Sequence, residues 1–449
     1  MTERIRQYLT RPVPRYTSYP TAPHFSDAVT SDLYADWLLR LDPAQPISLY
    51  LHVPYCKQAC WYCGCNMKLA ARPEPVAQYA ETLIQEIKLL SANLPSRMVL
   101  SHLHWGGGTP TSLSPDDLER TMEAVHANFD FTSDAEIAIE SDPRTLSDEM
   151  IARIGIIGFN RASFGVQEFD PKVQATINRI QPPEMVERAV DGLRAVGISS
   201  INFDLIYGLP NQTRDSLIRT IELSARMAPD RIALFGYAHV PWVAKRQRMI
   251  PEEALPCASE RLAQASAADI AIKELGYLPV GLDHFALPND SLAKAAKTGH
   301  LKRNFQGYTT DDAAALLGVG ATAIGRTPSG LVQSIAETGA WTRSVNAGVL
   351  PVMRGHALSN EDHLRGAIIE ALMCYGTVDL NAVKKDHAAI SGWADRAREH
   401  LVDMERDGLV YWQDEQLIVS DEALPLIRLI ASAFDTYLKR QQVRHSVAV

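Results

Sequence analysis

Between about residues 48 and 240 the sequence alternates short apolar, β-rich runs with amphipathic helical segments. Strands and helices alternating at this spacing are typical of a parallel sheet with right-handed crossovers. Six such units are too few to close an eight-stranded barrel. We therefore predict an α/β fold, a partial (three-quarter) open (β/α)6 TIM-like barrel with its chemistry at the C-terminal ends of the strands. The predicted strands are 47–53, 99–105, 136–141, 160–166, 201–208 and 231–237.

Helix signals lie between these strands. Ser114 followed by proline predicts an N-cap and a first helical residue, and Ser147 followed by two acidic residues predicts a second helix start. Residues 184–196 place apolar side chains at helical spacing and lead to Gly197, a candidate for the left-handed residue that ends a helix. These signals support the alternating pattern.

The pattern changes outside the barrel. The first 45 residues contain several prolines and little periodicity, and we interpret them as an arm over the main domain. Beyond residue 360 the periodicity is mostly helical around a hairpin-like segment, which resembles a winged-helix-like module. The predicted helices are near 361–375, 391–407 and 421–439, and the hairpin is 408–420. The predicted domains are an N-terminal arm (1–45), a catalytic barrel (46–355) and a C-terminal helical domain (356–449).

Charge and hydropathy exclude some classes of function. The net charge is −9, whereas proteins that bind phosphate backbones usually carry a basic surplus, so we expect no nucleic-acid partner. No apolar run approaches the roughly 18 residues that a membrane span needs. The first twenty residues lack the apolar region of a secretory signal. We expect no membrane association and a cytoplasmic location.

Four of the six cysteines, Cys56, Cys60, Cys63 and Cys65, lie within ten residues. Three closely spaced thiolates on a loop after a strand can bind three irons of a [4Fe–4S] cluster and leave the fourth iron open. A zinc site with Cys65 as fourth ligand is one alternative, but structural zinc sites use two separated ligand pairs. A redox disulfide is another, but it needs only two cysteines. We favour the cluster, with Cys65 outside its ligand set.

Two further features carry weaker signals. The isolated Cys257 and Cys374 are predicted to be small buried apolar residues. Segment 316–325 matches the G-x-G-x-x-A pattern of dinucleotide sites, but an apparent helix over 311–317 precedes it where such sites have a strand. We do not predict a dinucleotide site.

Polar groups and glycines occur where the predicted strands end. Gly107, Gly108 and Thr109 follow the second strand, and glycines allow the backbone to approach a ligand and offer N–H donors to a carboxylate. Glu140 closes the third strand, where a carboxylate can accept hydrogen bonds from ribose hydroxyls. A plain turn and a surface ion pair are the respective alternatives.

Two later strands also carry polar residues. Gln167 ends the fourth strand, and Asp204 lies within the otherwise apolar fifth. An unpaired buried carboxylate is costly, so Asp204 needs a ligand or a protein partner. Arg179, in the loop after Gln167, is a candidate cation for it.

The cysteine spacing, with Trp61 and Tyr62 before the third cysteine, resembles the radical S-adenosylmethionine superfamily. The resemblance implies that the open iron binds the amino and carboxylate groups of S-adenosylmethionine. An electron from the cluster then breaks the S–C5′ bond and gives a 5′-deoxyadenosyl radical. It also implies that the glycine segment holds the methionine part of this molecule.

Further motifs resemble the oxygen-independent coproporphyrinogen III oxidase family over nearly the whole chain. They are PRYTSYPTA (14–22), YLHVPYCKQACWYCGCN (50–66), GGGTPT (106–111), FNRASFGVQ (159–167), DLIYGLP (204–210), GLDHFA (281–286), RNFQGYTT (303–310) and FDTYL (434–438). The resemblance implies oxidative decarboxylation of the propionates on rings A and B of coproporphyrinogen III. The vinyl product is protoporphyrinogen IX.

The same resemblance implies a set of binding residues. The cluster ligands are Cys56, Cys60 and Cys63. Two S-adenosylmethionine molecules are implied, the first contacted by Tyr50, Gly107 and Glu140. The residues implied to contact one or both are Tyr62, Gly108, Thr109, Gln167, Arg179, Asp204, Ala238 and Ile324.

A substrate with four propionates needs local cations on an acidic chain. Arg15, Lys302 and Arg303 are candidates by motif position, with solvated surface charges as the alternative. Asp283 and His284 are candidates for proton handling or for packing. The resemblance further implies an electron donor, an electron acceptor and a monomer. A haem-handling, chaperone-like relative on the same scaffold, and a methylating or ring-opening enzyme with the same cofactor, are the alternative functions.

Overall fold

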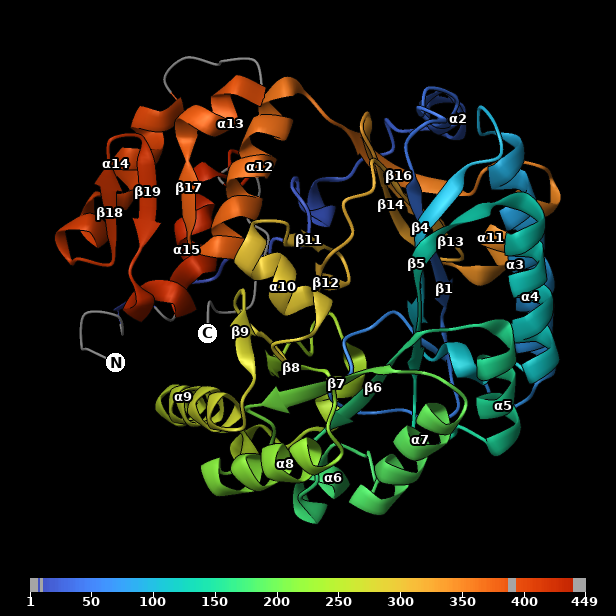
Figure 1. Ribbon diagram of the computed structural model, residues 1–449, viewed down its shortest axis with the longest axis horizontal. Coiled ribbons are helices and arrows are strands. Elements are labelled where there is room, and N and C mark those ends of the chain that lie inside the picture. The colour runs from blue at the N-terminus through green and yellow to red at the C-terminus, as the bar shows by residue number, and fades with distance from the viewer. Residues whose placement is uncertain (1–6, 9–10, 387–392, 439–449) are drawn as a thin grey trace. The chain divides into compact units, whose positions relative to one another are not determined.

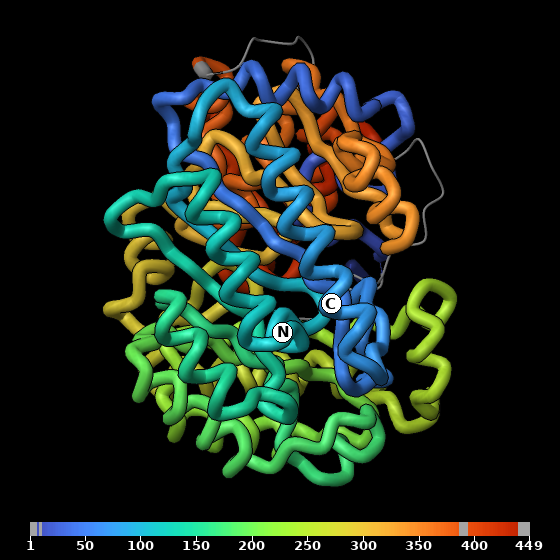
Figure 2. Tube along the Cα trace, turned by 90° about the vertical axis from the view of Figure 1, so that its right-hand side faces the viewer, coloured from blue at the N-terminus to red at the C-terminus, as the bar shows by residue number. Residues whose placement is uncertain are grey.

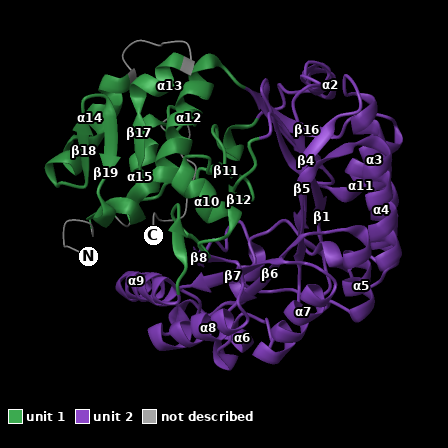
Figure 3. Cartoon of the chain, in the orientation of Figure 1, with its two compact units in different colours: residues 1–25, 276–312, 358–449 green, residues 26–275, 313–357 purple. Residues whose placement is uncertain are grey.

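The structure is a computed structural model that describes residues 7–8, 11–386 and 393–438. The chain forms two compact units, shown in different colours in Figure 3. Unit 2 comprises residues 26–275 and 313–357, and unit 1 comprises residues 1–25, 276–312 and 358–449.

Unit 2 is built around a sheet in which the strand order is β16-β15-β14-β13-β1-β4-β5-β6-β7-β8. Neighbouring strands from β13 to β8 are parallel, whereas β14, β15 and β16 pair antiparallel. All six predicted strands are present, which confirms the partial barrel. They are β1 (Ile47–Val53), β4 (Val99–Gly107), β5 (Asp130–Ser141), β6 (Arg161–Gln167), β7 (Ser200–Tyr207) and β8 (Arg231–Gly236). The added strands are β13 (Leu316–Val319), β14 (Ile324–Thr327), β15 (Gly330–Ser334) and β16 (Val352–Ala357).

Helices cover the outer face of these strands (Figure 1), and Figure 2 shows α3 and α4 side by side in this layer. The predicted helix starts are confirmed. The Ser114 hydroxyl accepts the Asp117 N–H at 3.1 Å, and the Ser147 hydroxyl accepts the Met150 N–H at 3.2 Å. The helices are α2 (Ser31–Leu39), α3 (Glu74–Ala92), α4 (Pro115–Asn128), α5 (Asp148–Ile157), α6 (Pro171–Thr176), α7 (Pro183–Ala195), α8 (Arg214–Arg226), α9 (Ala258–Glu274) and α11 (Thr338–Asn346).

Burial alternates along the barrel strands. In β7, Ile201, Phe203 and Leu205 are fully buried, whereas Asn202 and Asp204 are only half-buried. Successive side chains of a strand point to opposite faces, so the apolar residues pack under the helices and the polar ones face the inside of the barrel. The inner face is therefore the face available for chemistry.

Unit 1 combines helices with small sheets. Its three-stranded sheet, of order β17-β19-β18, includes the predicted hairpin, and the mostly helical character is confirmed. Its elements include β9 (Leu278–Val280), β10 (His284–Ala286), α10 (Ser291–Thr298), β11 (Lys302–Asn304), β12 (Gly307–Thr309), α12 (Asn360–Tyr375), β17 (Thr377–Asp379), α13 (Leu380–Asp386), α14 (Trp393–Arg406), β18 (Val410–Gln413), β19 (Gln416–Val419) and α15 (Ile427–Ala431).

Two tyrosines near the start of the chain belong to the core of unit 1. Tyr8 and Tyr16 are buried there, and their hydroxyls donate to Asp407 at 2.7 Å and Asp435 at 3.0 Å. The two compact units therefore divide the chain differently from the three predicted domains 1–45, 46–355 and 356–449. This domain division stays a prediction.

Three local predictions are wrong. The helix expected over 421–439 is broken into α15 and short 3-10 turns; Pro425, inside the first turn, removes a backbone donor there. Residue 439 lies outside the described residues. The helix expected over 391–407 is confirmed as α14, with residues 391–392 outside the described part. Residues 311–315 form no helix, and β13 begins at Leu316. Cys257 is exposed before α9, whereas Cys374 is buried as predicted.

No helix in the described part of the chain combines the length and the apolar character that crossing a bilayer requires.

A buried carboxylate on α3 holds the turn between β13 and β14. Glu86, only 3% exposed, accepts the Gly320 N–H at 2.7 Å and the Trp341 indole N–H at 2.9 Å. Tyr79, on the same helix, donates to the His52 carbonyl at 2.7 Å and accepts the Ala321 N–H. Burial raises the pKa of Glu86 to about 8, although both donors favour its ionised form.

Replacing Glu86 tests this electrostatic cost. The unfolded carboxyl ionises near 4.5 and the folded one near 8, so stability is lost as pH rises through that window. Glu86→Gln keeps an acceptor oxygen without the charge. We expect it to remove this loss and to raise the free energy of unfolding at pH 8 by on the order of 3 kcal/mol.

Urea unfolding at pH 5.5 and pH 8 measures the effect. Glu81→Gln, on the exposed face of α3, is the control and should keep the wild-type pH dependence. Equal pH dependence in Glu86→Gln and wild type would contradict the prediction.

Candidate active site

The cysteine loop begins where β1 ends. It starts with β2 (Tyr55–Cys56), which pairs in parallel with β3 (Lys68–Leu69). The Trp61 N–H donates to the Ile177 carbonyl at 2.9 Å, and the Asn178 side chain donates to the Ala59 carbonyl at 2.7 Å. These bonds hold the loop against the segment between α6 and α7.

The four loop cysteines have different surroundings. The Cys56 Sγ lies 3.4 Å from the Thr109 hydroxyl, and the Cys63 Sγ accepts the Cys65 N–H at 3.4 Å. Hydrogen bonds from Cys65 lower the pKa of Cys63 to about 6, and the same pairing raises the pKa of Cys65. Burial raises the pKa of Cys56 to about 11. The thiolate is the metal-binding form, so the cysteine spacing, and not these pKa directions, separates the proposed ligands from Cys65.

Two guanidinium groups donate hydrogen bonds to the Cys60 thiol. Arg144 Nη2 and Arg179 Nη1 each donate to the Cys60 Sγ at 3.3 Å. Asp142 holds both, at 2.6 Å from Arg144 Nη2 and 3.4 Å from Arg179 Nη1. Burial opposes ionisation of Asp142, but the two arginines hold its pKa down at about 2. Sequence reasoning missed Asp142 and Arg144, although the polar run after Glu140 was a usable signal.

The glycine segment approaches neighbouring backbone and side chains closely. Gly107 has φ +115°, and a Cβ on it would lie 2.6 Å from the His52 ring. A Cβ on Gly108 would lie 2.8 Å from the backbone of Pro54 and Tyr55. Only glycine fits both positions without a shift of the neighbours, so packing against the chain itself requires glycine here.

Glu140 braces this segment. Its carboxylate accepts the Gly107 N–H at 3.1 Å and pairs with His104 Nε2 at 3.1 Å. The Tyr50 ring stacks on His104, with centroids 5.9 Å apart. These residues come from three adjacent strands and form one wall on the inner face of the barrel.

A second contact joins β1 to the start of β14. The Tyr50 hydroxyl lies 2.9 Å from His52 Nδ1, and His52 Nε2 lies 3.3 Å from the Thr322 hydroxyl. Ile324 follows two residues later as the first residue of β14. Because β14 leaves the C-terminal end of β13, Ile324 lies at the same edge of the sheet as the cysteine loop.

Gln167 and Arg179 meet at the end of β6. Gln167 is buried with φ +65°, an uncommon backbone conformation for a residue other than glycine. Arg179 Nε and Nη2 donate to the Gly165 carbonyl at 3.0 and 2.5 Å. Such conformations cluster at ligand sites, where the surrounding structure holds them.

The expected pair between Arg179 and Asp204 is wrong. Arg179 pairs with Asp142, whereas Asp204 is half-buried and accepts the Asn202 side-chain N–H at 3.0 Å. Asn202 also donates to the Ser163 hydroxyl at 2.8 Å. Asp204 faces the inside of the barrel, so the burial cost that motivated the expectation is smaller than assumed.

Gln247 links the cysteine loop to the end of β8. Its side-chain amide donates to the carbonyls of Tyr62 at 2.8 Å and Ala238 at 3.1 Å, and the residue is 2% exposed. Gln247, which lies in none of the motifs, therefore links Tyr62 and Ala238, two residues that the resemblance implies as contacts of S-adenosylmethionine.

The predicted contacts of the cluster and of S-adenosylmethionine all belong to unit 2, whereas the candidate substrate residues Arg15, Asp283, His284, Lys302 and Arg303 belong to unit 1. Tyr50 and Asp204 lie on the inner face within strands, and the other contacts lie at the edge where the parallel strands end. Among the described residues, no three His, Cys, Asp or Glu side chains gather as they do around a single metal ion. A cubane does not require this, because each cysteine binds a different iron. The three loop thiols, with nearby cations, fit such a cluster.

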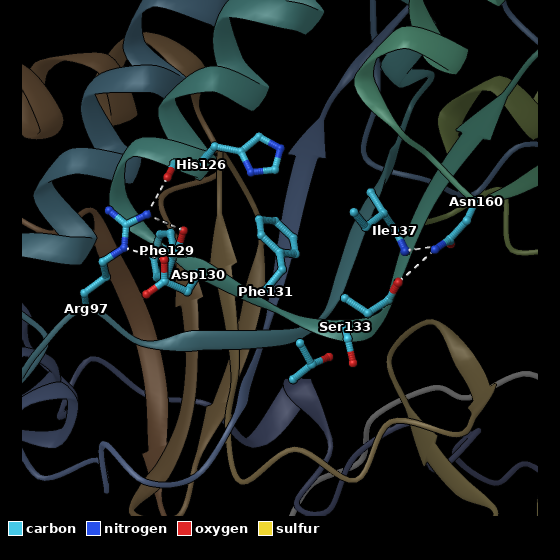
Figure 4. A pocket seen from close by; sticks show the side chains of 10 residues that line it. Arg97, His126, Phe129, Asp130, Phe131, Ser133, Ile137 and Asn160 are labelled. Carbon is cyan, nitrogen blue, oxygen red and sulfur yellow. Dashed lines mark hydrogen bonds and ion pairs between the residues drawn. The ribbon is translucent and has the colours of Figure 1, made fainter.

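A cavity of about 470 Å³ lies at the opposite edge of the sheet, where β5 starts (Figure 4). Arg97 donates to the carbonyls of His126 and Phe129 and pairs with Asp130 at 2.8 Å. Asn160 bonds the backbone of β5. These polar groups of the cavity wall are thus hydrogen-bonded within the protein. In a βα barrel the active site lies at the opposite edge of the sheet, where the strands end.

Fold and cysteine loop together define a radical S-adenosylmethionine protein, and the family model "Radical SAM superfamily" matches residues 50–224. More narrowly, the chain belongs to the oxygen-independent coproporphyrinogen III oxidase family. It is 46% identical over 437 residues to the protein of that name from Bradyrhizobium diazoefficiens, covering 97% of both chains. It is 38% identical to the one from Salmonella typhimurium, covering 95% of this chain and 93% of the relative.

A solved structure gives the same result. Coproporphyrinogen III oxidase (HemN) from Escherichia coli, a radical SAM enzyme, superposes with a TM-score of 0.90 at 36% identity, covering 95% of this chain and 100% of that one. Membership of this family implies a [4Fe–4S] cluster and S-adenosylmethionine, and it makes the chain an oxidoreductase.

Proposed function

We propose that this chain decarboxylates the propionates on rings A and B of coproporphyrinogen III to vinyl groups without oxygen, in haem biosynthesis. The product is protoporphyrinogen IX. The observation that carries the proposal is full-length similarity to proteins named for this activity, combined with a cysteine loop at the C-terminal edge of the barrel.

Cys56, Cys60 and Cys63 are the proposed cluster ligands. Their support is the C-x3-C-x2-C spacing on the loop after β1 and the two guanidinium groups at Cys60. Cys65 falls outside this spacing and is proposed to stay outside the ligand set.

The proposed contacts with S-adenosylmethionine surround this loop. They are Tyr50, Tyr62, Gly107, Gly108, Thr109, Glu140, Gln167, Arg179, Asp204, Ala238 and Ile324, and two molecules are proposed. When bound, cluster and S-adenosylmethionine supply a 5′-deoxyadenosyl radical, which removes the unactivated propionate hydrogen that no ordinary base can take. Arg179 offers a guanidinium to a carboxylate, and the glycines allow close approach of the backbone.

The remaining proposals are an electron donor, an electron acceptor, a monomeric state and a reducing cytoplasmic location. The cysteines support the last of these, because none of them forms a disulfide in the part of the chain that the structure describes.

Anaerobic turnover tests the function. The reconstituted chain, incubated with coproporphyrinogen III, dithionite and S-adenosylmethionine, should yield protoporphyrinogen IX, CO2 and 5′-deoxyadenosine. Tetrapyrrole binding without decarboxylation would sink the proposal and favour a haem-handling role.

The ligand set is tested by two serine variants. Cys56→Ser should lose the [4Fe–4S] spectrum, whereas Cys65→Ser should keep it nearly intact, because only the first removes a ligand. Iron content and electron paramagnetic resonance after anaerobic reconstitution measure both. Equal cluster loss would make Cys65 a ligand.

The Arg144 contact should tune the cluster. Its guanidinium, 4% exposed, places a positive hydrogen-bond donor on the Cys60 sulfur, which stabilises the reduced state. Arg144→Gln should lower the midpoint potential by on the order of 50 mV, since about 1.4 kcal/mol corresponds to 59 mV for one electron.

A redox titration followed by electron paramagnetic resonance measures this shift at equal iron content. Arg120→Gln removes the same charge from a half-exposed side chain in unit 2 and is the control. Identical potentials in Arg144→Gln and wild type would refute the tuning role.

A further inference from the structure

Arg303 lies in a short hairpin of unit 1, formed by β11 and β12. Arg303 is the cross-strand partner of Tyr308, and its guanidinium carbon lies 4.4 Å from the centre of the Tyr308 ring. Its backbone N–H donates to the Glu370 carboxylate at 3.1 Å. The hairpin thus fixes the base of the side chain and gives the cation an aromatic surface to stack on.

The Tyr308 ring is a rigid platform. Its hydroxyl donates to the Met373 carbonyl at 2.6 Å and accepts the Leu282 N–H at 3.0 Å. A Cβ on Gly281 would lie 2.0 Å from the ring, so the backbone packs directly against it. A guanidinium on such a platform has little freedom to move toward other partners.

Two of the three guanidinium nitrogens of Arg303 lack a hydrogen-bond acceptor among the described residues. Its Nε and Nη1 are buried, and neither bonds to any described residue. The Gln306 amide nitrogen, in the same hairpin, is also a buried donor without an acceptor. Buried donors are nearly always satisfied in folded proteins, so these point to an acceptor that the chain itself does not supply.

The neighbouring lysine behaves differently. Lys302 lies 3.7 Å from the Glu370 carboxylate, and its side chain is 45% exposed. The Lys302 ammonium has a protein partner and is open to solvent. Arg303 is half-buried, and its Nε and Nη1 have neither a described acceptor nor solvent exposure. Of these two predicted cations, only Arg303 has buried donors without an acceptor among the described residues.

The surroundings carry more positive than negative charge. Asp283 is tied to His284, whose Nδ1 lies 2.7 Å from its carboxylate, and His284 stands edge-on to Tyr308 at 5.1 Å. Burial opposes ionisation of Asp283, but His284, Arg303 and Arg15 together hold its pKa below the usual range. Three cations, Arg15, Lys302 and Arg303, thus lie near two carboxylates, Asp283 and Glu370, so an added anion would be attracted.

We propose that Arg303, stacked on Tyr308, binds a carboxylate of the substrate, a propionate of the tetrapyrrole. The identity of this ligand rests on the proposed function. A guanidinium fits a carboxylate with two parallel hydrogen bonds, which lysine cannot offer. S-adenosylmethionine also carries a carboxylate, so the experiment must separate the two sources.

Binding without turnover tests the site. The full-length, anaerobically reconstituted chain is titrated with coproporphyrinogen III in the absence of S-adenosylmethionine, and separately with S-adenosylmethionine alone. Arg303→Gln should weaken coproporphyrinogen III binding at least about 10-fold, as expected for lost charged hydrogen bonds. Arg303→Lys should weaken it by an intermediate factor, and S-adenosylmethionine binding should not change.

Lys302→Gln is the matched control and should change coproporphyrinogen III affinity less than about 2-fold, as expected for an exposed ion pair. Unchanged affinity in Arg303→Gln, or equal losses in both variants, would overturn the site. Loss of S-adenosylmethionine binding alone would assign Arg303 to that ligand and overturn it too. If Arg303→Gln does not fold, Arg303→Lys decides: wild-type affinity in it rejects the site.

Turnover by the wild-type chain separates this inference from the proposed function. If wild type converts coproporphyrinogen III and Arg303→Gln binds it normally, only the Arg303 site is wrong. If wild type neither binds nor converts it, the proposed function itself has failed.

Discussion

Parallel pairing on both sides of β1 determines where the rest of unit 2 lies. Val53 is paired with Gly107 of β4, and Leu51 is paired with Val319 of β13. Parallel strands end at a common edge, so the cysteine loop, the glycine segment and the turn after β13 are brought together. Glu86 reinforces this edge from outside by binding that turn, at the electrostatic cost of a buried carboxylate.

The charge of the whole chain and the charge of its sites have opposite signs. The sequence carries a net charge of −9, yet two arginines share Asp142 beside Cys60, and two others lie near Asp283 in unit 1. Local fields depend on near neighbours much more than on distant, screened surface charges. An acidic protein can therefore hold thiolates and attract carboxylates at particular places.

What the sequence predicts well is local. The strands of the barrel, the caps at Ser114 and Ser147 and the cysteine loop follow from periodicity, turn chemistry and spacing within short windows. The pairing of Arg179 could not be found in this way, because Asp142 and Asp204 are both remote in sequence and only the fold selects between them. Gln247, whose partner Tyr62 is 185 residues away, left no local signal at all.

The two arginines at Cys60 are held by different contacts. Arg144 is bound to Asp142 at 2.6 Å, a short charged hydrogen bond that keeps it beside the sulfur. Arg179 is anchored through Nε and Nη2 on the Gly165 carbonyl, while its contacts with Asp142 are 3.4 Å long. These contacts are long, but both groups are buried and Arg179 is the strongest influence that lowers the pKa of Asp142, so separating the pair is costly. Both guanidinium groups are thus fixed positive charges beside the Cys60 sulfur.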